Sequence, residues 1–207
     1  MPYRPDHKEK TRLRIIDAAR RLFNRHGFEG VSIDQIMAEA GLTRGGFYHH
    51  FATKDELFSE AVACYSRCNP PEAWLGNDPQ VGSPEEHLAR QILTAYLSEQ
   101  HLSSLDHQCP MIALPSDVAR SGPAVRKAYQ KLLEGMIGIF QSGSKAQENN
   151  PRGTALAITT LCVGGMVLAR TIEDPALQTE IRETARDLAL SLGGLDGREA
   201  ETAENIR

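Results

Sequence analysis

The chain has 207 residues, of which 41% are hydrophobic and 24% are charged. This composition is typical of a folded globular protein, and it excludes a wholly disordered chain, a collagen-like chain or a coiled-coil rod. The formal net charge is −4, but residues 1–50 hold nine Lys and Arg against six Asp and Glu, whereas the remaining residues hold 14 against 21. A basic end on an acidic body indicates that this end meets a polyanion.

Cysteine usage and hydropathy predict the cellular compartment. The N-terminal sequence MPYRPDHKEK lacks the apolar segment of a secretory signal, and the four cysteines are scattered along the chain at Cys64, Cys68, Cys109 and Cys162. The longest apolar stretch, residues 155–169, falls short of the ~18–20 apolar residues that a membrane span requires, and glycines and threonines dilute it. We therefore expect a cytoplasmic protein with free thiols and no membrane partner.

Apolar residues recur at spacings of three and four in nearly every long segment, which predicts an all-α fold. The N-terminal part is expected to form four helices, at about residues 8–26, 32–40, 43–48 and 53–69. Gly27 and Gly41 are the predicted ends of the first two helices. Ser32 and Thr43 are the predicted N-caps of the second and third.

The segment 69–84 is rich in Pro, Gly and Asn, which favours a break in the fold. It contains the single tryptophan, Trp74, which could cover a pocket or fill a junction. Further helices are expected at about residues 84–105, 123–146, 151–173 and 175–193. The stretch between 105 and 123 is expected to be irregular, with at most one short helical turn near 116–119, and residues 193–207 are expected to be a flexible tail.

Residues 32–54, SIDQIMAEAGLTRGGFYHHFATK, place two short helices and a glycine-containing turn within about twenty residues. This is the spacing of a helix-turn-helix, whose second helix enters the major groove of DNA. The residues expected to reach base edges are Thr43, Arg44, Gly45 and His49, and Arg44 can pair with guanine through two N–H groups. The residues expected to contact phosphate are Ser32, Tyr48 and Lys54. His50 is interpreted as a packing residue.

The run AARRLFNRHGFEGVSIDQIMAEAGLTRGGFYHHFATKDELF resembles the tetracycline-repressor family of bacterial transcription regulators, over about residues 10–60. The resemblance implies an all-helical homodimer with a helix-turn-helix DNA-binding domain at 1–53 and an effector-binding and dimerisation body at 54–207. It implies double-stranded operator DNA and a small-molecule effector of unknown identity as partners, and a repressor more often than an activator. Family bodies diverge beyond residue 60, so the effector is not implied.

The last two long helices of such a body usually form the dimer interface. The candidate interface residues are Leu161, Gly164, Gly165, Leu168, Leu177, Ile181, Leu188 and Leu192. The leucines and the isoleucine would supply apolar area, and the two glycines would allow close approach of the partner helices.

Eight residues are candidates for an effector pocket or a sensor, although all are also typical of ordinary core: Tyr96, His107, Cys109, Met111, Tyr129, Phe140, Cys162 and Met166. Cys109 stands out, because a nearby imidazolium would favour its thiolate. The segment HQCPMIALPSDVARSGPAVRKAY resembles a branch of the same family in which some members respond to electrophiles or oxidants. A buried structural cysteine is the competing interpretation.

Three alternatives remain open. Cys64 and Cys68 lie four residues apart and could join His101, His107 or Cys109 in a metal-responsive site, although no CxxC or HxxxH pair supports one. A helical adaptor that binds no DNA would leave Arg44, Tyr48 and Lys54 without a role. An enzyme is not expected, because no phosphate-binding loop, nucleophile elbow or acid–base pair is found. No cofactor and no resident metal are predicted.

Overall fold

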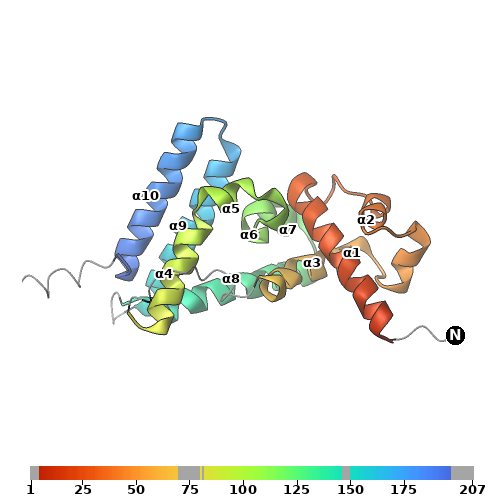
Figure 1. Ribbon diagram of the computed structural model, residues 1–207, viewed down its shortest axis with the longest axis horizontal. Coiled ribbons are helices and arrows are strands. Elements are labelled where there is room, and N and C mark those ends of the chain that lie inside the picture. Colours follow the sequence, from red (N-terminus) through yellow and green to blue (C-terminus); the bar gives the residue numbers. More distant parts are fainter. Residues whose placement is uncertain (1–4, 70–79, 81, 146–149, 197–207) are drawn as a thin grey trace, which may run out of the picture. The chain divides into compact units, whose positions relative to one another are not determined.

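The computed structural model describes residues 5–69, 80, 82–145 and 150–196, and all their regular structure is helical, as predicted (Figure 1). The first elements are α1 (Pro5–His26), α2 (Ile33–Glu39), the 3-10 helix η1 (Arg44–His49) and α3 (Lys54–Cys68). The middle elements are α4 (Pro84–Tyr96), α5 (Glu99–Ser103), the 3-10 helix η3 (Leu105–His107), α6 (Pro110–Ala113) and α7 (Pro115–Arg120). The last are α8 (Pro123–Gly143), α9 (Pro151–Thr171) and α10 (Pro175–Gly193).

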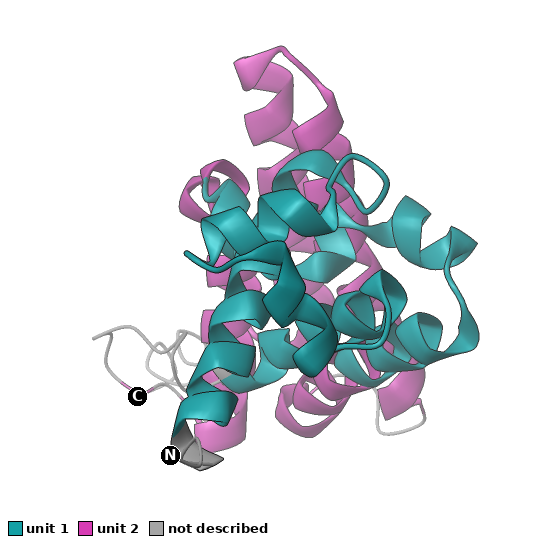
Figure 2. Ribbon diagram, turned by 90° about the vertical axis from the view of Figure 1, so that its right-hand side faces the viewer, with its two compact units in different colours: residues 1–68, 104–132 teal, residues 69–103, 133–207 magenta. Residues whose placement is uncertain are grey.

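The chain divides into two compact units (Figure 2). Unit 1 comprises residues 1–68 and 104–132, and unit 2 comprises residues 69–103 and 133–207. The compact units do not follow the boundary expected at residue 53, because residues 54–68 and 104–132 belong to unit 1. A functional boundary at residue 53 stays a prediction. The position of Trp74 and most of the expected C-terminal tail lie outside the described residues.

The core of unit 1 is built around α1, which packs against α2, α3 and η3, while η1 packs against α2. Aromatic side chains fill it, and Phe23, Phe47 and Phe58 are fully buried. Phe23 and Phe58 meet edge to face with ring centroids 5.0 Å apart. Aromatic residues bury large apolar areas, so these few side chains contribute much of the packing among α1, α2, η1 and α3.

The ends of the first two helices follow the sequence prediction. Gly27 and Gly41 adopt positive φ values of 71° and 66°, which glycine accepts without steric cost. Ser32 caps α2 in a reciprocal capping box with Gln35. The prediction for Thr43 was wrong in detail, because its side chain makes no capping hydrogen bond.

The segment 105–123, expected to be irregular, forms η3, α6 and α7 within unit 1. Pro110 and Pro115 stand at the first turns of α6 and α7, where a proline costs the helix no hydrogen bond. The prolines that suggested irregular structure therefore mark helix starts.

The helix expected at 84–105 in unit 2 is interrupted after Tyr96. Arg182 of α10 donates from Nη1 to the Leu97 carbonyl at 3.0 Å, and the His101 ring Nδ1 lies 2.8 Å from the Tyr96 carbonyl. These side chains satisfy carbonyls that a continuous helix would bond internally, so the break costs few hydrogen bonds. Helix α5 then begins at Glu99.

Helices α9 and α10 lie side by side in unit 2 (Figure 1). Helix α9 is long and apolar enough to cross a membrane on length and composition alone. Its residues Ala155, Ile158, Cys162 and Met166 are fully buried, which is typical of the core helix of a soluble protein.

Candidate nucleic-acid interface

Helix η1 presents one side to the core and the other to solvent. Phe47 is fully buried and packs against Phe51, with ring centroids 5.8 Å apart. The residues predicted to reach DNA from this helix and its N-cap are all exposed: Thr43, Arg44, Gly45, Tyr48 and His49. The Tyr48 ring is 60% exposed and stands edge to face on Phe47 at 5.2 Å, which holds its hydroxyl outward on a rigid support.

Arg44 forms an ion pair with Asp34 on the exposed surface. Its Nη1 lies 2.5 Å from Oδ2 of Asp34, in the first turn of α2, and the two side chains are 63% and 55% exposed. Gly45 beside it faces open space, because an added Cβ would meet nothing within 4 Å. Another chain could therefore approach the backbone here closely.

Ser32 and Lys54, the predicted phosphate contacts outside η1, both hold local structure. The Ser32 hydroxyl accepts from Gln35 N at 3.2 Å and lies 2.9 Å from Gln35 Oε1. Lys54 Nζ donates to the Phe28 carbonyl at 2.5 Å and sits over the Phe28 ring. Desolvation lowers the pKa of Lys54. Their contact with phosphate stays a prediction.

Two arginines of α1 bind the ends of η1 and α2 and so hold the helix-turn-helix in place. Arg12 donates to the carbonyl of His50, at the end of η1, and its guanidinium lies 4.1 Å from the Phe51 ring centroid. Arg14 donates from Nη2 to the Ala40 carbonyl, at the end of α2, at 2.5 Å. These contacts span 38 and 26 residues, and local sequence carries no signal for them.

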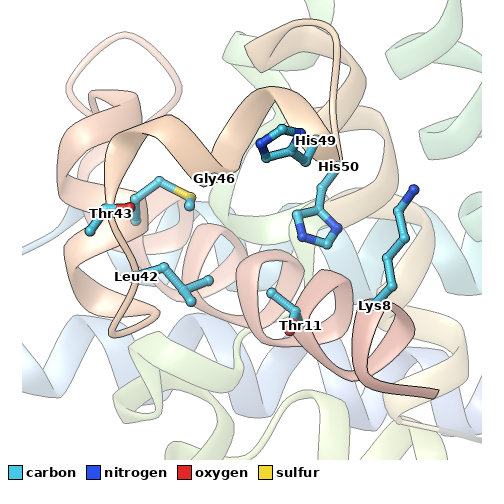
Figure 3. Close-up of a pocket in the computed structure, with 8 residues that line it drawn as sticks. Lys8, Thr11, Leu42, Thr43, Gly46, His49 and His50 are labelled. Carbon is cyan, nitrogen blue, oxygen red and sulfur yellow. The ribbon is translucent and has the colours of Figure 1, made fainter. Parts of the chain in front are cut away.

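A cleft of about 460 Å³ lies beside η1 (Figure 3). It is lined by Lys8, Thr11, Met37, Leu42, Thr43, Gly46, His49 and His50. Burial, with the positive charges of Lys8 and Arg12 nearby, lowers the pKa of His50. Lys8 was not singled out in the sequence, and it adds a cation next to the predicted reading helix.

The candidate sensor residues are divided between the two units. His107, Cys109, Met111 and Tyr129 belong to unit 1, and Tyr96, Phe140, Cys162 and Met166 belong to unit 2. Cys109 is fully buried, whereas the His107 side chain is exposed, so the expected access to the thiol is not present. Burial raises the pKa of Tyr129, with Cys109 nearby, to about 12. It likewise raises that of Cys162 to about 12.

The metal alternative gains no support. Among the described residues, no three or more His, Cys, Asp or Glu side chains gather as a metal site requires. Cys64 is buried, and His101 is buried with its Nδ1 at the Tyr96 carbonyl. The side chain of Cys68 lies outside the described residues.

Several predicted interface residues on α9 and α10 have exposed apolar side chains. Leu168, Leu177, Leu188 and Leu192 are 56%, 40%, 49% and 37% exposed, and Leu161 and Ile181 are half-buried. Leu156, which the sequence did not single out, adds a further 43%-exposed side chain on α9.

The two glycines of the predicted interface differ. At Gly164 an added Cβ would meet nothing within 4 Å. Gly165 does not fit the predicted surface, since its Cβ would lie 2.9 Å from the Ala185 Cβ of α10 in the same chain. The small residue is needed there for packing within unit 2.

Comparison with known proteins supports the helix-turn-helix and the fold. The model of the family "Bacterial regulatory proteins, tetR family" matches residues 15–61. The TetC protein of transposon Tn10 from Escherichia coli is 38% identical over 65 residues, which are 31% of this chain and 32% of TetC. The chain thus spans about a third or less of the length of this and comparable curated relatives.

Two further similarities extend over most of the chain. The uncharacterized regulator YxaF of Bacillus subtilis is 26% identical over 180 residues, covering 84% of this chain and 90% of YxaF. A TetR transcriptional regulator from Chloroflexus aurantiacus has a similar crystal structure, with a TM-score of 0.70, 22% identity and coverage of 90% and 95%. Residues 15–61, which include α2 and the exposed η1 helix, thus match the tetR family of bacterial regulatory proteins, and the chain as a whole has an all-helical fold similar to that of a TetR regulator.

Proposed function

We propose that this protein is a cytoplasmic transcriptional regulator that binds double-stranded operator DNA through η1. The observation that carries the proposal is the exposure of Thr43, Arg44, Gly45, Tyr48 and His49 along one short element whose opposite side is anchored by the buried Phe47. A rigid element with exposed polar side chains next to small residues can enter a major groove and bring donors to base edges. The function requires no catalysis.

The protein acts as a homodimer in this proposal. The exposed leucines of α9 and α10 form an apolar surface that solvent contact disfavours, and Gly164 leaves room for close approach of a partner helix. A two-fold dimer presents two copies of η1, which requires a palindromic operator with half-sites about one turn of DNA apart. Repression follows when such an operator overlaps a promoter.

In this proposal a small-molecule effector lowers the affinity of the protein for its operator DNA. To lower operator affinity, the effector must bind the DNA-free conformation of the protein more tightly than the DNA-bound conformation. The burial of Cys109 supports a structural role for this thiol rather than reaction with an electrophile.

The test is a selection of random DNA duplexes by the purified full-length protein. We expect a palindrome to be enriched. Replacement of Arg44 by Ala is expected to weaken binding by about 1–3 kcal/mol and to relax specificity at one base pair of each half-site. A selection that enriches no sequence would refute the proposal, and enrichment of a single half-site would refute the homodimer.

A further inference from the structure

We propose that Asp34 is a specificity-determining residue of the DNA interface. It orients Arg44 for base reading and opposes binding to DNA that lacks the matching base. This inference rests on the proposed function, because it assigns the role to a contact within the same surface. The geometry that carries it is the short ion pair between the two exposed side chains.

Asp34 is held on a fixed support. It lies in the first turn of α2, within the Ser32–Gln35 capping box, and α2 is anchored in the core through Ile36 and Met37, which are 0% and 1% exposed. Its carboxylate therefore has a defined position relative to η1.

Arg44 has much less local support. It begins η1 and is followed by Gly45 and Gly46, which offer no side chain for it to pack on. The contact that the structure gives its guanidinium is Oδ2 of Asp34, 2.5 Å from Nη1. A flexible side chain on a glycine-rich helix is thus tied to a rigid neighbour.

The ion pair leaves the guanidinium able to read a base. A guanidinium carries five N–H donors in a planar fork, and contact with guanine uses two of them. One N–H of Nη1 directed at Asp34 leaves the donors of Nη2 and Nε. Holding the fork in place before binding reduces the rotamer entropy that Arg44 loses on docking.

The carboxylate also acts against the wrong sequences. An exposed negative charge on a surface that meets DNA repels phosphates whatever the base sequence. This uniform repulsion does not change discrimination, but the ion pair does: at a non-matching base pair it keeps the Arg44 guanidinium from turning to a neighbouring phosphate, so Asp34 weakens binding to other duplexes relative to the matching one. Because exposed ion pairs are weak, we expect a change of about two- to fivefold in discrimination.

The experiment uses the full-length protein and the duplex that the wild type enriches from a random library. Dissociation constants are measured at one salt concentration for that duplex and for three duplexes altered at the base pair where Arg44→Ala loses discrimination. Four proteins are compared: the wild type, Asp34→Asn, Arg44→Ala and the double variant. Asp55→Asn is the matched control, because Asp55 is likewise an exposed first-turn aspartate, at the start of α3.

We expect Asp34→Asn to bind the three altered duplexes more tightly and to lose two- to fivefold in discrimination. In the Arg44→Ala background, the same change should leave discrimination unaltered. The control should raise affinity for all four duplexes equally.

Two results would overturn the role of Asp34 while leaving the regulator intact. One is unchanged discrimination in Asp34→Asn, and the other is an equal loss of discrimination with and without Arg44. A melting temperature measured for each variant shows whether a change in discrimination among the duplexes comes from partial unfolding of the protein. If the wild type enriches no duplex, the role of Asp34 and the proposed function both fail.

Discussion

Buried polar side chains of α1 hold the segment around η3 in unit 1. Asn24 is 1% exposed and donates from Nδ2 to the Gln108 carbonyl at 2.8 Å. Arg20 is 4% exposed and donates to the Asp106 carbonyl. These bonds join α1 to residues that lie 84 and 86 positions further along the chain, in the segment around η3.

Removing the amide of Asn24 should destabilise the protein. In Asn24→Ala the buried Gln108 carbonyl loses this donor, and we expect the free energy of unfolding to fall by about 1–3 kcal/mol. Urea denaturation followed by circular dichroism measures the change. Gln141→Ala, which removes an exposed amide from α8, is the control and should change stability by less than about 0.5 kcal/mol. Equal effects of the two substitutions would contradict the role of the buried bond.

The ion pair between Arg25 and Asp106 should make stability depend on acid pH. Arg25 donates from Nη2 to Asp106 Oδ2 at 2.6 Å, and this hydrogen bond lowers the pKa of Asp106 below its ordinary value. A lowered carboxyl pKa contributes stability above the unfolded-state pKa of about 4 and loses it as the pH falls through the folded-state value.

Asp106→Asn should therefore be less stable than the wild type at pH 7, and the difference should shrink steadily below pH 4. Unfolding free energies from pH 7 down to pH 2.5 would show this convergence. A difference that stays constant over the range would mean that the ion pair does not link folding to the Asp106 proton.

At the scale of elements, helix ends and helix crossings were predictable to different degrees. The ends at Gly27 and Gly41 follow from single residues with special backbone freedom, and both predictions are confirmed. The break after Tyr96 depends on Arg182, whose bond to the Leu97 carbonyl spans 85 residues, so no local pattern could indicate it. The 3-10 geometry of η1 has a local cause, because two adjacent glycines weaken a regular α-helix by about 1 kcal/mol each.

The crossing of α9 and α10 gives a prediction at this scale. Gly165→Ala should place a Cβ 2.9 Å from that of Ala185, so one helix must shift. We expect a loss of about 1–3 kcal/mol in the free energy of unfolding. Gly138→Ala on α8, where an added Cβ meets nothing within 4 Å, is the control and should be neutral or stabilising. If thermal melts show no difference between the two variants, the close contact between residue 165 of α9 and Ala185 of α10 does not limit side-chain size at residue 165.

At the scale of the whole molecule, the exposed leucines of α9 and α10 predict how copies of the chain associate. Leu188→Glu places a charge in the proposed interface, where burial in a dimer would be costly. We expect the variant to sediment as a monomer at concentrations where the wild type is a dimer, and to bind the selected palindrome at least tenfold more weakly. Leu105→Glu is the control, because Leu105 is 43% exposed but lies on η3 in unit 1. A dimeric Leu188→Glu protein would place the interface elsewhere.

The sequence by itself determined the helical class, the helix-turn-helix at 32–54 and the residues on its exposed side. These depend on apolar spacing, capping residues and glycines, which act over a few residues of chain. Only the tertiary structure decided which cations are engaged: Lys54 with the Phe28 carbonyl, Arg12 with the end of η1, and Arg44 with Asp34. It also showed Cys109 to be buried and Gly165 to face its own chain. The physical reason is the same in each case, since the partner of a long polar side chain or of a small packing residue is set by neighbours in space that local sequence does not encode.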